Sequence, residues 1–161
     1  MARFAIAFCL VLGALFAFEL SPPGQAIVKP WTALVTSTGA GVIREFDGTA
    51  TSSGNVLIDS KTGFAVSIEA GCNGVEAMLV LLAAMLAFPA SWRLKLTGIV
   101  LGVLAVQVLN LVRIVSLFYP GQWNAAAFKW AHLYLWQVLI MLDVLVVWLV
   151  WMRWVNRAKA Q

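Results

Sequence analysis

The chain has 161 residues, of which 62% are hydrophobic and only 11% are charged, and its mean hydropathy is +0.90. So few charged side chains cannot cover the surface of a soluble domain, and the composition therefore predicts an integral membrane protein. The net charge of +4 is spread thinly, with no basic run that could follow a phosphate backbone. It excludes nucleic-acid binding as the main function and instead carries information about membrane topology.

The first apolar run extends from Phe4 to Leu20. Its basic start, its apolar core and the residues Ser21–Ala26 that follow are also typical of a signal peptide with a cleavage site. The run is long for a signal core, so we favour a retained helix. Residues 1–20 are taken as a first transmembrane helix, with a signal-like anchor as the alternative.

Residues 21–71 are rich in Gly, Ser and Thr, and we expect short strands there rather than helix. Val56–Ile58 and Phe64–Ile68 flank a glycine-containing turn and predict a β-hairpin. Val42–Phe46 would add a third strand. The segment would be either a tether or a lid over a site at the outer membrane surface.

Three further apolar runs can cross a bilayer, which needs about 20 residues. They are Cys72–Phe88, which stops at Pro89; Leu96–Phe118, closed by Pro120 and Gly121; and His132–Met152. The sequence therefore predicts an all-α integral membrane protein with about four transmembrane helices and a small β-rich extracytoplasmic segment between the first two. Residues 72–152 would form a three-helix membrane core, and residues 153–161 a cytoplasmic basic tail.

The distribution of Lys and Arg predicts the orientation. With both termini in the cytoplasm, the inner side carries basic residues and no acidic ones: Arg3, Arg93, Lys95, Arg153, Arg157 and Lys159. The outer side mixes both signs: Lys29, Arg44, Lys61 and Lys129 with Glu45, Asp47, Asp59 and Glu69. Since positive charge stays inside, we expect a multi-pass protein of the cell (inner or cytoplasmic) membrane with cytoplasmic termini.

Three chemically capable residues are expected at one level near the outer face. Cys72 stands at the outer end of the second predicted helix, Arg113 lies five residues before the outer end of the third, and His132 opens the fourth. Each alone has a simpler interpretation: an apolar filler, an arginine that snorkels to the headgroups, and a member of an aromatic belt. However, an intramembrane arginine costs about 2.5–3.5 kcal/mol on insertion scales, and Asn110 and Gln107 continue a polar stripe below it.

Together these residues suit acyl transfer at a cysteine. A helix N-terminus and nearby cations would lower the pKa of the Cys72 thiol, which must become a thiolate to attack a carbonyl. His132 could take the thiol proton and deliver it to a leaving amine, and the Arg113 fork could stabilise an oxyanion.

Two acids lie on the predicted helices. Glu76 is one turn below Cys72 and could orient His132 or pair with Arg113, and we count Glu76, Asn73 and Asn110 as candidates for tuning the site. Asp143 lies at about the same depth as Gln107, about 16 Å below the outer ends of their helices, and we expect it to hydrogen-bond between the last two helices. No metal site and no cofactor is expected.

These residues resemble the exosortase/archaeosortase family of membrane cysteine transpeptidases. The matching pieces are Ala70-Gly71-Cys72-Asn73-Gly74, Asn110-Leu111-Val112-Arg113-Ile114 and Ala131-His132. The resemblance implies that Cys72 is the nucleophile and that Arg113 and His132 complete the catalytic set. The compact chain is most like the short exosortase H branch, although Asn73 stands where the family frequently has serine.

The resemblance also implies the substrate and the reaction. The partners would be exported proteins that end in a sorting signal, made of a short motif, a membrane helix and a basic cluster; the signals of the H branch resemble the IPTL type. Cleavage would pass through a thioester, with transfer to a cell-surface amine or another acceptor, or with hydrolysis.

Two other classes remain open on the sequence. A non-catalytic multi-pass protein, such as a complex subunit or an oligomeric pore, would explain the helices but not the shared level of Cys72, Arg113 and His132. A membrane thiol oxidoreductase would need a second cysteine beside Cys72, and Cys9 lies in the middle of the first apolar run.

Overall fold

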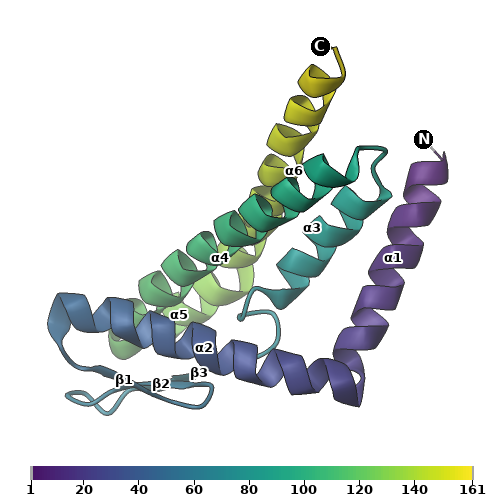
Figure 1. Cartoon of the computed structure of the whole chain (residues 1–161). Coiled ribbons are helices and arrows are strands. Elements are labelled where there is room, and N and C mark those ends of the chain that lie inside the picture. The colour runs from purple at the N-terminus through teal and green to yellow at the C-terminus, as the bar shows by residue number, and fades with distance from the viewer. Residues whose placement is uncertain (1, 161) are drawn as a thin grey trace.

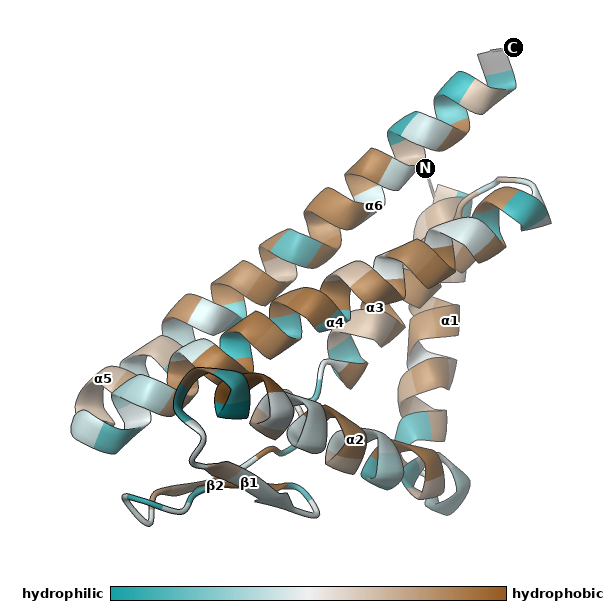
Figure 2. Ribbon diagram, turned by 60° about the vertical axis from the view of Figure 1, so that its left-hand side comes forward, coloured by the Kyte–Doolittle hydropathy of each residue, from teal (hydrophilic) through white to brown (hydrophobic). Residues whose placement is uncertain are grey.

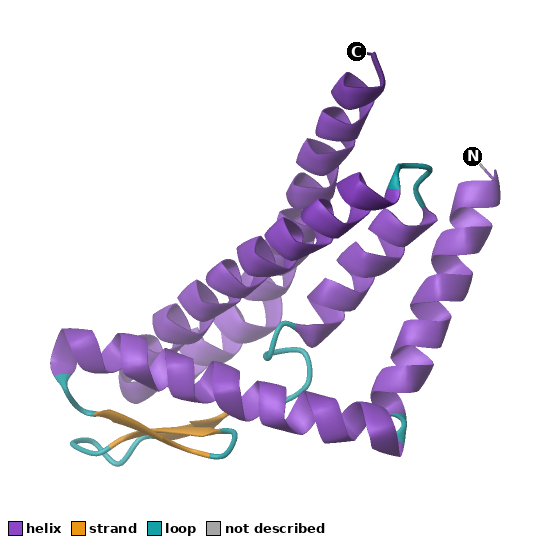
Figure 3. Cartoon of the chain, in the orientation of Figure 1, coloured by secondary structure: helices purple, strands orange, loops and turns teal. Residues whose placement is uncertain are grey.

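The computed structural model describes residues 2–160, which are mostly helical. The elements in chain order are α1 (Ala2–Leu20), α2 (Pro22–Asp47), β1 (Ala50–Ser53), β2 (Val56–Asp59), β3 (Ala65–Ser67), α3 (Val75–Ala87), α4 (Trp92–Trp123), α5 (Ala125–Trp130), the π-helical turn η1 (Ala131–Leu135) and α6 (Trp136–Ala160). Helices α1, α3, α4 and α6 form the body of the molecule, and α2 crosses one end of it beside the small sheet (Figure 1). Both termini and the turn between α3 and α4 lie at the opposite end (Figure 3).

Within residues 2–160, three helical segments are long and apolar enough to cross a membrane: Ala2–Leu20, Trp92–Trp123 and Ala125–Lys159. Apolar residues run along most of the length of α4 and α6, and hydrophilic residues gather at the C-terminal end of α6 (Figure 2). The second predicted span is shorter than expected, because α3 has 13 residues and rises only about 20 Å at 1.5 Å per residue. Glycines with positive φ at Gly71 and Gly74 delay its start.

The expectation of strands rather than helix was wrong for the first half of the segment 21–71, because α2 occupies Pro22–Asp47. Ser21 caps this helix by accepting the Gly24 amide at 3.3 Å, and Gly48, with φ 72°, ends it. Its buried positions repeat every three or four residues, as on one face of a helix: Thr32, Val35, Thr36, Gly39, Ala40 and Ile43. Val42–Phe46 therefore belongs to α2 and is not a strand.

The predicted hairpin is confirmed. Strands β2 and β3 pair antiparallel, with Leu57 opposite Val66. The third strand of the sheet is β1, which pairs with β2 and follows α2 directly. The sheet and α2 share one apolar core with the C-terminal half of α4, which includes Val35, Ile43, Leu57, Ile114 and Phe118.

A second apolar core joins α3, α4 and α6 through Leu81, Met85, Val106, Val144 and Trp151. Trp151 also donates from Nε1 to the Leu94 carbonyl at 2.8 Å. This contact depends on Gly98, since a Cβ atom there would collide with the Trp151 ring. This core holds α4 and α6 side by side. It therefore fixes the position of Arg113, on α4, relative to His132, which precedes α6.

The last two predicted spans have different ends in the structure. Helix α4 continues through Pro120 to Trp123, although the proline at this position lacks the N–H that would bond to the carbonyl four residues earlier. Helical structure resumes at Ala125, so His132 does not open the last helix but lies two turns inside it. Helix α6 continues to Ala160, and the basic residues of the C-terminal segment are therefore helical.

Candidate active site

Cys72 lies in the loop between β3 and α3, three residues before the helix begins at Val75. Two glycines with positive φ, Gly71 (81°) and Gly74 (78°), turn the backbone on either side of Cys72 and Asn73. The Cys72 amide donates to the Glu69 carbonyl at 2.9 Å. The expectation that Cys72 sits on the helix N-terminus was therefore wrong, because two left-handed residues keep this stretch out of the helix.

The structure brings the three predicted residues together. The Cys72 Sγ atom lies 3.6 Å from His132 Nε2, and Arg113 Nη2 donates to the same sulfur at 3.6 Å. The side chains come from a loop, from α4 and from η1, so they meet only in the folded molecule. One sulfur atom is thus flanked by an imidazole and a guanidinium.

Arg113 does not snorkel to the surface, since its side chain is only 2% exposed. Its Nη1 donates to the Gly71 carbonyl at 2.8 Å. Its Nε is buried and has no hydrogen-bond partner among the described residues. The guanidinium therefore holds the Gly71 carbonyl with Nη1 and the Cys72 sulfur with Nη2, and its Nε donor is not used by the described residues.

His132 is half-buried and lies in the π turn η1. Its ring stacks on Phe128, with 5.6 Å between ring centroids and 23° between the planes. This contact fixes the plane of the imidazole while Nε2 faces the thiol. Single π turns inside helices frequently occur at functional sites.

Glu76 acts on the backbone of the cysteine loop. Its Oε1 accepts the Gly71 amide at 2.6 Å, while Arg113 binds the carbonyl of the same residue. The two charged side chains therefore clamp Gly71 from both ends of the residue. The alternatives considered for Glu76, orienting His132 or pairing with Arg113, are replaced by this contact.

Asn73 is 1% exposed and fixes the loop to two helices. Its Oδ1 accepts the Val75 amide at 3.0 Å at the start of α3, and its Nδ2 donates to Thr32 Oγ1 of α2 at 2.9 Å. Trp31 of α2 also donates to its carbonyl at 3.3 Å. Sequence reasoning missed Thr32 and Trp31 because it missed α2; their spacing on its buried face was the available signal.

The polar stripe of α4 faces protein, as expected. Gln107 Nε2 donates to the Asn73 carbonyl at 3.4 Å, and Asn110 is fully buried. A Cβ atom at Gly74 would lie 2.5 Å from Gln107 Nε2 and 3.2 Å from Asn110 Nδ2. These amides therefore pack against the loop that carries Cys72.

The expected bond from Asp143 across the last two helices is absent from residues 2–160. Gln107 donates instead to Asn73 and to Met78 Sδ at 3.3 Å, and Asp143 Oδ2 is buried without a hydrogen-bond partner in the described part of the chain. Equal depth did not bring the two side chains together, because Gln107 turns toward the cysteine loop.

The electrostatic expectation for the thiol also needs correction. Burial raises the pKa of Cys72, the Arg113 guanidinium opposes that shift, and the Glu76 carboxylate adds to it. The thiol is therefore protonated at rest and must lose its proton at the moment of attack. This requirement gives the adjacent imidazole a clear role as the base.

The cavity around these groups is small. Its volume is about 20 Å³, and its lining includes Val66, Ile68, Cys72, Arg113, Phe128 and His132. No group of three or more His, Cys, Asp or Glu residues is arranged to hold a metal ion within residues 2–160.

Comparison with known proteins gives one match. The family model described as Transmembrane exosortase matches residues 1–150. This range includes α1, α2 and the sheet as well as the three elements that carry Cys72, Arg113 and His132. No curated protein and no solved structure shows a significant match to the chain.

Proposed function

The chain belongs to the transmembrane exosortase family, and we propose that it is a membrane-embedded cysteine transpeptidase in which Cys72 is the nucleophile. Family membership itself makes it a multi-pass membrane protein and suggests a membrane transpeptidase. The assignment to this chain rests on one observation: an imidazole and a guanidinium each lie 3.6 Å from the same free thiol.

The first half-reaction forms a thioester. His132 Nε2 takes the thiol proton as Cys72 Sγ attacks the scissile carbonyl carbon, and the carbonyl oxygen becomes an oxyanion. Arg113 donates to that oxyanion from Nε and Nη2, with the guanidinium braced by its bond to Gly71. When the C–N bond breaks, the imidazolium gives its proton to the leaving amine. The N-terminal part of the substrate stays on Cys72 as a thioester.

The second half-reaction releases the acyl group. An amine or water attacks the thioester carbonyl, the C–S bond breaks, and the proton of the attacking group passes through His132 to the Cys72 sulfur. An amine acceptor gives transfer and water gives hydrolysis. Both outcomes use the same three side chains.

The substrates would be exported proteins with a C-terminal sorting signal of a motif, a membrane helix and a basic cluster, as in the exosortase H branch that the sequence resembles. The architecture supports this class, since the candidate site lies at the sheet end of the helical bundle (Figure 1). A substrate that is anchored by its own helix is confined to two dimensions beside Cys72, which raises its effective concentration.

The direct test is capture of the acyl-enzyme. The wild-type chain in lipid nanodiscs, mixed with a synthetic sorting-signal peptide, should gain the mass of the N-terminal fragment on the tryptic peptide that contains Cys72. Neutral hydroxylamine, which cleaves thioesters, should remove the added mass. Cleavage without any adduct, and undiminished after alkylation of the protein, would contradict the proposal.

Glu76 offers a graded test of the loop clamp. Glu76→Gln keeps an acceptor for the Gly71 amide but loses the charge, so we expect processing to slow by about three- to tenfold, as for about 1 kcal/mol of hydrogen-bond strength. Glu76→Ala should slow it further because the amide loses its partner. Initial rates at matched membrane abundance measure both. A normal rate in Glu76→Ala would mean that the clamp does not position Cys72.

The membrane orientation follows from charge. Both termini and the α3–α4 turn share one end of the molecule (Figure 3), and that end carries basic residues that include Arg93, Lys95 and Arg157. Reporter fusions after Lys95 and at the C-terminus should be active in the cytoplasm, and fusions within the sheet should be active outside. A cytoplasmic signal from the sheet would place Cys72 on the wrong side for exported substrates.

A further inference from the structure

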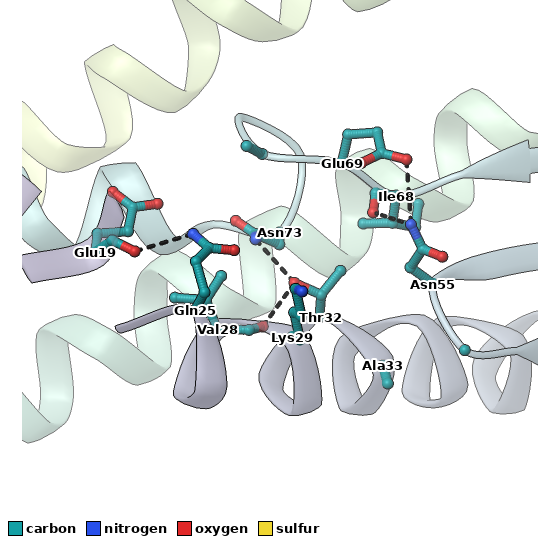
Figure 4. A pocket seen from close by; sticks show the side chains of 12 residues that line it. Glu19, Gln25, Val28, Lys29, Thr32, Ala33, Asn55, Ile68, Glu69 and Asn73 are labelled. Atoms are coloured by element: carbon teal, nitrogen blue, oxygen red, sulfur yellow. Dashed lines mark hydrogen bonds between the residues drawn. The ribbon is translucent and has the colours of Figure 1, made fainter. Parts of the chain in front are cut away.

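A second, larger cavity lies on the other side of the loop that carries Cys72. Its volume is about 440 Å³, and its walls come from the end of α1, the first half of α2, the β1–β2 turn and the segment before α3. The polar lining residues include Glu19, Gln25, Lys29, Asn55, Glu69 and Asn73, which converge from these separate elements (Figure 4). The proposed mechanism uses none of this space.

The lining of the cavity includes an unpaired carboxyl group. Glu19, the penultimate residue of α1, is only 6% exposed, and its Oε2 has no hydrogen-bond partner among residues 2–160. The contact beside it involves its backbone, since Gln25 Nε2 donates to the Glu19 carbonyl at 2.9 Å. A buried carboxylate without a partner is costly, and a positively charged group in the cavity would offset that cost.

The rest of the lining also favours a cation. Glu69 adds a second carboxylate at the exposed side of the cavity, where Asn55 Nδ2 donates to it at 3.1 Å. The single lining cation, Lys29, has an exposed side chain. With both carboxyl groups ionised, the lining carries a net charge of −1, and its buried charge, on Glu19, is negative, whereas Glu69 and Lys29 are exposed.

The cavity adjoins the catalytic loop. Ala70 and Asn73, two residues before and one after Cys72, line it, and Ile68 lines both this cavity and the one around the thiol. The loop that carries Cys72 therefore forms part of the wall of this cavity and separates it from the space around the thiol. This position suits the second substrate of a two-step transfer.

We infer that this cavity binds the acceptor of the transfer reaction as a primary ammonium group, with Glu19 as its counter-ion; the inference rests on the proposed function. The sorting signal would not supply the cation, because in the proposed orientation its basic cluster would lie at the opposite end of the bundle. The bound ammonium loses one proton to solvent, which ends its attraction to Glu19, and the neutral amine then passes the Cys72 loop to reach the thioester. Its nitrogen then forms the C–N bond as the C–S bond to Cys72 breaks, and its second proton returns to the sulfur through His132.

Binding can be tested without any turnover. Ethylamine, which is an ethylammonium ion at neutral pH, should bind the full-length chain in nanodiscs saturably, as measured by ligand-observed NMR. Glu19→Gln should raise its dissociation constant at least tenfold, and Lys29→Gln should lower it. Glu45→Gln removes an exposed acid of α2 outside the cavity and should leave the constant unchanged. Absence of saturable binding, or equal affinity in Glu19→Gln and the wild type, would overturn the inference.

Turnover gives a second readout. With a sorting-signal peptide and added ethylamine, mass spectrometry should show a ratio of ethylamide to hydrolysed product at least tenfold lower in Glu19→Gln. An unchanged ratio, with both products falling together, would make Glu19 merely structural and overturn the inference. If the wild type processes no peptide, the proposed function fails, while the binding measurement still decides whether the cavity holds an ammonium group.

Discussion

Replacing Cys72 by alanine is expected to abolish substrate processing, to below about one thousandth of the wild-type rate, as for the loss of a nucleophile in other covalent enzymes. The side chain is half-buried, and its polar contacts are to His132 and Arg113. Its removal therefore deletes the reacting atom while the loop stays clamped at Gly71. Cys72→Ser should be nearly as inactive, because a serine hydroxyl is far harder to deprotonate than a thiol.

The matched control is Cys9→Ala, which removes the other free cysteine, an exposed side chain on α1. This variant should process substrate normally. Cleavage of a co-expressed sorting-signal reporter, normalised to membrane abundance by immunoblot, compares all three variants. Processing in Cys72→Ala at more than a few per cent of the normal rate would refute the cysteine mechanism.

Arg113→Lys is expected to lower kcat by about 10²–10³, the usual effect of removing one oxyanion donor. Arg113 donates from Nη1 to the Gly71 carbonyl and from Nη2 to the Cys72 sulfur. Its Nε has no hydrogen-bond partner among the described residues. Lysine keeps the charge, but its single ammonium cannot reproduce this planar arrangement. The loss should therefore appear in the chemical step at saturating substrate.

Arg93→Lys is the control for this substitution, because Arg93 is exposed at the start of α4, at the end of the helix opposite the sheet. It should keep normal activity. Single-turnover cleavage of a sorting-signal peptide by the purified chains would separate formation of the thioester from its release. Wild-type thioester formation in Arg113→Lys would mean that Arg113 serves only as a structural tie to Gly71.

The convergence of Cys72, Arg113 and His132 could be predicted because it depends on a coarse property, the alternation of apolar helices. The hairpin was likewise visible, since Val56–Ile58 and Phe64–Ile68 alternate around a glycine turn. What the sequence could not show was the local backbone of the site. Because Gly71 and Gly74 have positive φ, Cys72 lies in a loop before α3. The pattern of apolar residues along the sequence does not show which glycines adopt positive φ.

Helix α2 was missed for a different reason. Its Gly and Thr residues have weak helix propensity, so composition suggested strands. Its stability comes from the small buried side chains Thr32, Thr36 and Ala40, which let the helix pack closely, and from its caps at Ser21 and Gly48. Tertiary packing thus overrode local preference, and it placed Thr32 beside Asn73.

The π turn at Ala131–Leu135 changes the direction in which His132 points relative to the buried face of α6. His132 precedes Ile140, on the buried face of α6, by eight residues. A regular α-helix would turn about 800° over that distance and leave His132 about 80° away from this face. A π turn holds about one residue more, which takes back about 100° and returns His132 to the side that faces Cys72. The direction of the imidazole therefore depends on the number of residues in this one turn. Deleting one residue of the π turn would leave His132 chemically intact but would rotate it away from the thiol.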